Sequence, residues 1–117
     1  MACKSIIFTT SQTNTPLVDC KANENLSVYK VSIYTNNANS ANVAAKVTFG
    51  AAGIYSAEDI TGHPGIDAGN GFVEATDRKS PIGEGHPGQP IVFTCGTPTS
   101  GSIQVNISYD KWPHSIV

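Results

Sequence analysis

The sequence predicts an all-β protein, an antiparallel β-sandwich of the jelly-roll or immunoglobulin-like kind with no substantial helix. Apolar and polar residues alternate over 101–110 and 26–35, which is the period of a strand with one buried face. Turn-forming residues divide the chain into short apolar segments, as in a sandwich of about seven to nine strands. No segment has the 3.6-residue period of a helix, and residues 56–60 offer one turn at most.

The first half of the chain contains four segments with strand character. Residues 4–10 predict a strand that lies either at a sheet edge or at the chain's entry to the core. Residues 15–21 predict a second strand that Pro16 begins, since a strand tolerates proline best at its first position. The next strand, 26–35, is expected to place three residues on one face, Tyr29, Val31 and Ile33, and four on the other, Val28, Lys30, Ser32 and Tyr34.

The fourth segment, 42–49, is expected to return beside the third. Its inward residues are Val43, Ala45, Val47 and Phe49, and its outward residues are Lys46 and Thr48. The Asn- and Ser-rich residues 36–40 predict a turn, so that 26–35 and 42–49 together predict a hairpin.

The pattern weakens over residues 50–88, which hold nine of the eleven glycines. Two interpretations remain open for this region. It forms either long surface loops, where binding and assembly contacts usually lie, or several short strands with glycine bulges.

The end of the chain has the clearest strand. Ile103, Val105, Ile107 and Tyr109 alternate with polar residues and are expected to face the core. With residues 90–95 and the turn between them, this strand predicts a second hairpin. Residues 111–117 form a short C-terminal tail.

The length and the charge of the chain limit the possible functions. The 117 residues predict a single domain, 1–117, large enough to bury a core without metal or disulfide support. Charged residues make up only 14%, and the formal net charge is −2, with the basic residues scattered singly. We therefore expect no nucleic-acid partner, and the lack of a long apolar run predicts no membrane span. The N-terminus lacks the apolar region of a secretory signal.

The three cysteines predict free thiols in a reducing compartment, since their number is odd and no C-x-x-C pair occurs. A bridge between Cys3 and Cys20 on neighbouring strands is the alternative. Cys95 is in phase with Ile91 and Phe93, so we expect it to lie in the core.

No motif indicates a cofactor. Residues 83–88 match G-x-G-x-x-G by letters, but prolines flank its last glycine and no helix can follow, so we reject a dinucleotide site. His63-Pro64-Gly65 and His86-Pro87-Gly88 predict type II turns with exposed histidines. A metal site would require the two loops to converge with Asp67 and Glu84, and we predict none.

No arrangement of residues indicates catalysis. The sequence has no G-x-S-x-G elbow, and Cys95 has no evident base beside it. Glu58 and Asp59 are adjacent and would point to opposite faces of a strand, which disfavours a carboxylate pair. We therefore predict that the protein is not an enzyme.

Two features suggest binding to another molecule. The tail carries Trp112 and ends in Ile116 and Val117, and it packs either on its own domain or on a neighbouring subunit. Trp112 is also, with Tyr55 and Tyr109, a candidate aromatic platform for a sugar.

Parts of the sequence resemble small β-rich structural proteins of tailed bacteriophages. The similar parts are residues 31–49, a strand, an Asn/Ser turn and a returning strand, and residues 69–110, which end in the strand GSIQVNISYD. The shared features are strands and turns, so no catalytic or binding residue carries over.

The resemblance implies a capsid decoration (cement) protein or a related head or tail protein, often a homotrimer. Its partner would be the major capsid protein or another virion protein, and its location the capsid surface after assembly in the bacterial cytoplasm. The elements expected to make contact are the N-terminal strand, the loops of 50–88 and the tail. Their candidate interaction residues are Ile6, Phe8, His63, Phe72, His86, Trp112, Ile116 and Val117. A receptor- or carbohydrate-binding tail-fibre module is the alternative.

Overall fold

The computed structural model describes residues 2–36, 38–39, 41–76 and 80–113. These residues form strands and connecting loops, and no helix occurs among them, so none that could span a membrane is found there. The strands are β1 (Ala2–Phe8), β2 (Gln12–Val18), β3 (Glu24–Thr35), β4 (Val43–Phe49), β5 (Glu58–Ile66), β6 (Gly71–Ala75), β7 (Gly83–Glu84), β8 (Ile91–Cys95) and β9 (Ile103–Pro113).

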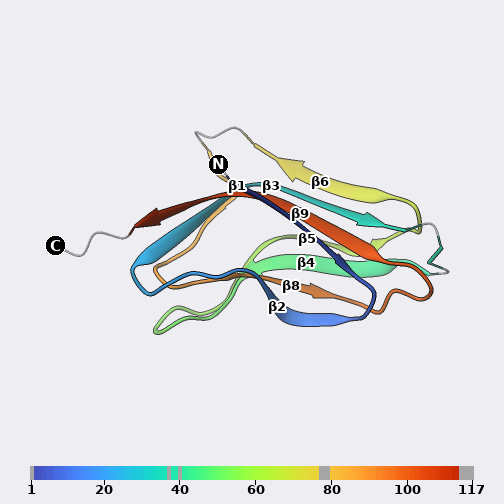
Figure 1. The fold of residues 1–117 in the computed structure, drawn as a ribbon, viewed down its shortest axis with the longest axis horizontal. Coiled ribbons are helices and arrows are strands. Elements are labelled where there is room, and N and C mark those ends of the chain that lie inside the picture. Colours follow the sequence, from blue (N-terminus) through green and yellow to red (C-terminus); the bar gives the residue numbers. More distant parts are fainter. Residues whose placement is uncertain (1, 37, 40, 77–79, 114–117) are drawn as a thin grey trace.

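The strands form two antiparallel sheets that pack face to face. One sheet has the order β1-β9-β3-β6, with β7 also paired to β3, and the other has the order β2-β8-β4-β5. Figure 1 shows the first sheet in the upper part of the view and the second in the lower part. The predicted β-sandwich is therefore confirmed.

The strand order identifies the topology as a jelly roll. β6 and β7 both pair with β3 and act as two parts of one interrupted strand. The chain is then one long hairpin in which β4 pairs with β5, β3 with β6 and β7, β2 with β8, and β1 with β9. Rolling this hairpin into two layers gives eight strands in two Greek keys, which distinguishes the fold from an immunoglobulin sandwich.

Apolar residues from both sheets fill the space between them. The inward row of β9, Ile103, Val105 and Ile107, is buried as predicted. The inward row expected for β4 is buried too, and it comprises Val43, Ala45, Val47 and Phe49. Tyr109 is half-buried against this core.

Both predicted hairpins are wrong. β3 belongs to the five-stranded sheet and β4 to the four-stranded sheet. Likewise, β9 belongs to the five-stranded sheet and β8 to the four-stranded sheet. The two turns are instead arches between sheets. They meet at one end of the molecule, where Asn39 Oδ1 accepts a 3.0 Å hydrogen bond from Gly101 N–H and Asn36 N–H donates one of 2.9 Å to Ser102 O.

One predicted strand face is also wrong. Val28 was expected opposite Val31 and Ile33, yet all three are fully buried in the same core. The β3–β9 register shifts between Val28 and Lys30, so Tyr29 is an extra residue in a bulge. A bulge reverses the side on which the following residues point, so each part of β3 directs its own alternate row into the core.

The remaining boundaries shift by a few residues. β2 begins at Gln12, which places Pro16 inside the strand, at the sheet edge, and not at its start. Over residues 50–88, the interpretation as short strands is the one observed, since β5, β6 and β7 lie there. Residues 111–113 continue β9, and residues 114–117 lie outside the described part.

Candidate functional site

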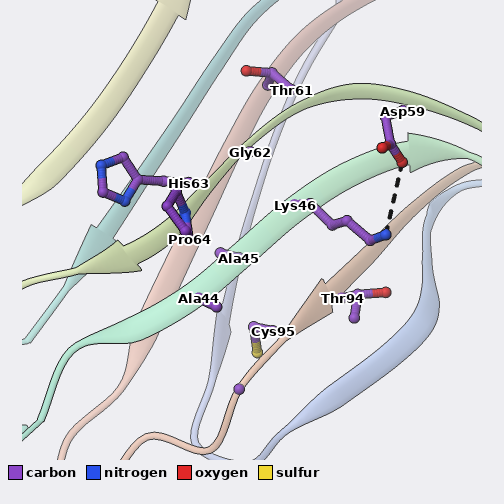
Figure 2. A pocket seen from close by; sticks show the side chains of 11 residues that line it. Ala44, Ala45, Lys46, Asp59, Thr61, Gly62, His63, Pro64, Thr94 and Cys95 are labelled. Carbon is purple, nitrogen blue, oxygen red and sulfur yellow. Dashed lines mark ion pairs between the residues drawn. The ribbon is translucent and has the colours of Figure 1, made fainter.

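A groove of about 450 Å³ lies on the outer face of the four-stranded sheet. It crosses β4, β5 and the end of β8, as Figure 2 shows. The residues that line it are Ala44, Ala45, Lys46, Asp59, Thr61, Gly62, His63, Pro64, Thr94, Cys95 and Gly96.

The groove exists because small residues meet at its centre. Gly62 lies opposite Lys46 in the β4–β5 ladder, and a Cβ at position 62 would lie 2.7 Å from the Lys46 Cβ. Glycine is therefore what permits the strands to approach here. Ala44 contributes only a methyl group and Gly96 only its backbone, so no long side chain fills the middle of the groove.

Polar groups stand at the two ends of the groove. At one end, the Lys46 Nζ atom lies 3.7 Å from Asp59 Oδ1, and both side chains are more than half exposed. At the other end, His63 contributes to the lining, but its ring points away from the groove floor toward Phe72 of the other sheet, with ring centroids 5.9 Å apart. Its Nδ1 atom accepts a 3.1 Å hydrogen bond from the Gly65 N–H.

This arrangement is suited to binding a ligand. Aliphatic floor atoms with a donor and an acceptor at one end match a ligand that has an apolar face and a polar rim. The one thiol in the lining belongs to Cys95, which is buried. Burial raises the pKa of this thiol above its ordinary value, more than the hydrogen bond from the Gln12 backbone lowers it, so the nucleophilic thiolate is disfavoured.

A second cluster lies where the loops before β5 and β8 meet. The Tyr55 and His86 rings stack with centroids 4.3 Å apart, and His86 Nε2 lies 4.0 Å from Glu58 Oε1. Gln89, which is fully buried, holds the two loops together. Near this cluster, Ile54 occupies the tip of a tight turn and is 91% exposed.

The outer face of the five-stranded sheet is a third surface with unusual chemistry. Over β1, β6 and the parts of β3 and β9 beside them, the strand register places on it Cys3, Ser5, Ile7, Lys30, Ser32, Tyr34, Gly71, Val73, Ala75, Gln104, Asn106 and Ser108. In this part Lys30 alone is charged, and Ile7, Tyr34 and Val73 are exposed apolar or aromatic side chains. Two acidic residues, Glu84 and Asp110, lie on the same face beside Ser27, beyond the bulge in β3.

Hydrogen bonds fix the polar side chains in the middle of this face. Asn106 Nδ2 donates to Ser32 Oγ at 3.2 Å, and Gln104 Nε2 donates to Asn106 Oδ1 at 3.1 Å. Nearer β1, Cys3 Sγ lies 3.4 Å from Ser108 Oγ. Because these groups already satisfy part of one another's hydrogen-bonding capacity, covering the face costs less than burying free amides would.

The predicted interaction residues do not form one site. Ile6, Phe8 and Phe72 are half-buried against the core, and Phe8 stacks on Phe93 at 5.5 Å. Trp112 is half exposed at the end of β9 and donates to Ser27 Oγ at 3.2 Å. Ile116 and Val117 lie outside the described residues, so their docking stays a prediction.

The two histidines stay apart. His63 lies on the edge strand β5 opposite Ala45 and contacts the Phe72 ring, whereas His86 is beside Glu58 at the start of β5. Within the described part of the chain, no group of three His, Cys, Asp or Glu side chains is placed to hold a metal ion. The first His-Pro-Gly segment lies in β5 and is not a turn, which corrects the prediction.

The second His-Pro-Gly segment is the predicted type II turn. Gln89 N–H donates to His86 O at 3.1 Å, and Gly88 has φ +85°. All three cysteines are free, so the alternative bridge between Cys3 and Cys20 is not formed. Sequence reasoning missed Gln89 and the groove residues Gly62 and Thr94, since only the pairing of distant strands brings them together.

Comparisons with known proteins give structural likeness without a family. No family model matches the sequence, and no curated protein matches it. A chain of the Bacillus endospore appendages, described as a family of disulfide-linked pili, is similar over 97% of this chain and 88% of its own, with 8% identity and a TM-score of 0.45. PirA is similar over 92% of this chain and 85% of its own, with 8% identity and a TM-score of 0.44.

A viral protein is similar at the same level. The chain of the extra small virus of the giant freshwater prawn Macrobrachium rosenbergii matches over 98% of this chain and 78% of its own, with 11% identity and a TM-score of 0.40. Such distant likenesses carry no inference about activity or partner. The assignment of the jelly roll therefore rests on the strand order of this chain.

Proposed function

We propose that the protein is a structural component of a bacteriophage virion, a decoration protein that binds the assembled capsid and stabilises it. The observation that carries this proposal is the charge-poor part of the outer face of the five-stranded sheet, over β1, β6 and the strands between them, where Lys30 is the one charged residue. Protein interfaces are depleted of charge at their centre and enriched in aromatic residues, since burying an unpaired charge is costly. The centre of this face is uncharged, since it is formed by Ser32, Asn106 and Gln104, and Tyr34 is its aromatic residue.

A protein of this kind has no need of a catalytic site. It binds the assembled lattice and not the separate capsid subunits, so each bound copy shifts the equilibrium toward the shell by mass action. A rigid sandwich with a flat face loses little conformational entropy on docking.

The test uses particles of the phage that encodes the chain. Particles made without the gene should release their DNA at a lower temperature, and added purified protein should restore the resistance. Val73→Lys adds a charge to this charge-poor face at an exposed apolar position and should abolish the restoration. Ile54→Lys, at an exposed apolar position in the turn before β5, is the matched control and should restore as well as the natural protein. Particles that are equally stable without the protein would contradict the proposal.

The groove on the four-stranded sheet favours a second candidate, a receptor-binding module for carbohydrate. A sugar ring has an apolar face for the Ala44 and Gly62 floor and hydroxyl groups for Lys46 and Asp59. The aromatic platform that the sequence suggested is not the basis for it, because Trp112 and Tyr55 are absent from the groove lining.

A glycan array tests the second candidate. Binding to a defined glycan that Ala44→Leu removes, by filling the floor, would support it. Gln104→Leu, on the other sheet, is the control and should bind normally. An array without binding would count against a carbohydrate ligand.

A further inference from the structure

The two sheets have edge strands that the structure treats very differently. β1 and β6 are the edges of one sheet, and β2 and β5 are the edges of the other. An edge strand presents unpaired N–H and C=O groups, which recognise another extended strand. Natural proteins therefore protect their edges with prolines, bulges, charged side chains or short length unless the edge is used.

Three of these edges are protected by a proline, a bulge or short length. β2 contains Pro16, and its register with β8 shifts on both sides of the Thr15–Pro16 pair of residues. β5 contains Pro64, and its register with β4 shifts twice. β6 has only five residues, and a loop separates it from β7, which continues the pairing with β3.

β1 has no proline, no bulge and no short length, and its one protecting feature is the charged side chain of Lys4. Its seven residues pair with β9 from Ala2↔Tyr109 to Phe8↔Ile103 without a shift, and it contains neither proline nor glycine. Among the residues that the structure describes, no strand pairs with its outer edge. Ile7 lies beside that edge with 63% of its surface exposed.

From this contrast we propose that β1 pairs antiparallel with β1 of a second copy of the chain, which joins the two five-stranded sheets across a two-fold axis at Ser5. The proposal does not depend on the function proposed above. An antiparallel edge pair is isologous and closes at two copies, so it replaces the trimer that the sequence resemblance implied.

The length of β1 selects this register. Ser5 is the middle residue of Ala2–Phe8, so an axis at Ser5 pairs all seven residues of each strand and leaves no backbone group of the edge without a partner. An axis at any other residue of the strand would leave residues unpaired.

The side chains agree with the same register. Opposite residues of an antiparallel pair lie on the same face. Cys3 then lies opposite the partner's Ile7 on the outer face, and each copy covers the exposed isoleucine of the other. Lys4, the one charged residue of β1, lies opposite the partner's Ile6, whereas an axis at Lys4 would bring two like charges together.

A second copy fits this edge better than an unrelated strand. The two strands have equal length by identity, and the two Lys4 residues are diagonal neighbours and not directly opposite each other. The half-buried Ile6 and Phe8, at the margin of the core, lie opposite the methylene groups of the partner's Lys4 and the methyl group of the partner's Ala2, which cover them.

Disulfide trapping tests the register directly. Ser5→Cys in a Cys3→Ser background places two thiols opposite each other at the axis, and mild oxidation should convert most of the protein to a covalent dimer. Asn106→Cys in the same background lies on the same face, but in β9, and should remain unlinked. Light scattering of the unmodified full chain at micromolar concentration should give the mass of a dimer.

Charge variants test the same axis without a thiol. Ser5→Lys puts two positive charges opposite each other and should weaken dimerisation by at least about tenfold, as should Ser5→Glu. Mixing the two variants should restore a dimer, since the introduced charges are then opposite in sign. A substitution that merely disturbed folding would not be rescued in this way.

Some outcomes would overturn the proposal. These are a monomer or trimer for the unmodified chain, a dimer that does not cross-link through position 5, or a dimer that persists in Ser5→Lys. Unfolding curves of each variant, followed by circular dichroism, show whether the sandwich remains intact. If both position-5 charge variants were unfolded, the cysteine pair would still decide the register.

Discussion

The Gln89 Nε2 atom donates a hydrogen bond of 2.9 Å to the carbonyl oxygen of Ser56, which joins the loop before β8 to the loop before β5. The same side chain donates to Gly50 O at 3.2 Å and accepts from His86 N–H at 2.8 Å. Its exposed fraction is 0%, so water cannot replace these partners. The stacked Tyr55 and His86 rings depend on this connection for their positions.

Gln89→Ala is therefore expected to destabilise the protein by about 2 kcal/mol, because it leaves buried donors and acceptors without partners. Chemical denaturation measures the change. Gln104→Ala, on the outer face of β9, removes a glutamine whose partner stays accessible, and it should cost less than about 0.5 kcal/mol. Equal effects of the two substitutions would show that Gln89 does not hold the loops together.

Gly62→Ala should be more harmful than Gly96→Ala, although both positions line the groove. A Cβ at position 62 would lie 2.7 Å from Lys46 Cβ and 2.8 Å from Ala45 O, and the β4–β5 ladder would have to open. At position 96 the nearest atom is 3.8 Å away. We expect a loss of about 1–3 kcal/mol for the first variant and little change for the second, measured as the free energy of unfolding.

The three thiols should differ in reactivity. Cys3 is exposed on β1, Cys20 is half-buried, and Cys95 is buried in the sandwich. At pH 8 a disulfide reagent such as Ellman's reagent should label one thiol rapidly and Cys95 only when the protein unfolds. Cys3→Ser should remove the fast phase. A fast phase that persists in this variant would place the accessible thiol elsewhere.

Stability should fall at alkaline pH partly through Cys95. Burial raises the pKa of its thiol above the ordinary value of 9.0. The unfolded chain therefore releases the proton at a lower pH than the folded protein, and stability falls as the pH rises above about 9. Burial also raises the pKa of Cys20, so this thiol contributes with the same sign.

Unfolding experiments between pH 8 and 10 measure that slope. Cys95→Ala changes the stability at every pH, but it should also make the decline with pH less steep, since one of the contributing protons is gone. Cys3→Ser is the control and should keep the slope of the natural protein. An unchanged slope in Cys95→Ala would mean that this thiol does not contribute.

The sequence by itself determined the strands and most of the core. The alternation in β4 and β9 correctly assigned Val43, Phe49, Ile103 and Ile107 to the interior, because the period of two follows from the geometry of a single strand. The absence of a helical period likewise predicted the class, and the phase of Cys95 with Phe93 predicted a buried thiol.

Pairing was decided only by the tertiary structure. The turns after β3 and β8 predicted hairpins, yet both connect one sheet to the other. The jelly roll instead pairs strands that are far apart in the sequence, β1 with β9 and β2 with β8. Which strands become neighbours depends on closing a common core, and no local pattern records it. The groove at Gly62, the connection through Gln89 and the weakly protected edge of β1 all follow from those distant pairings, so the sequence could not reveal them.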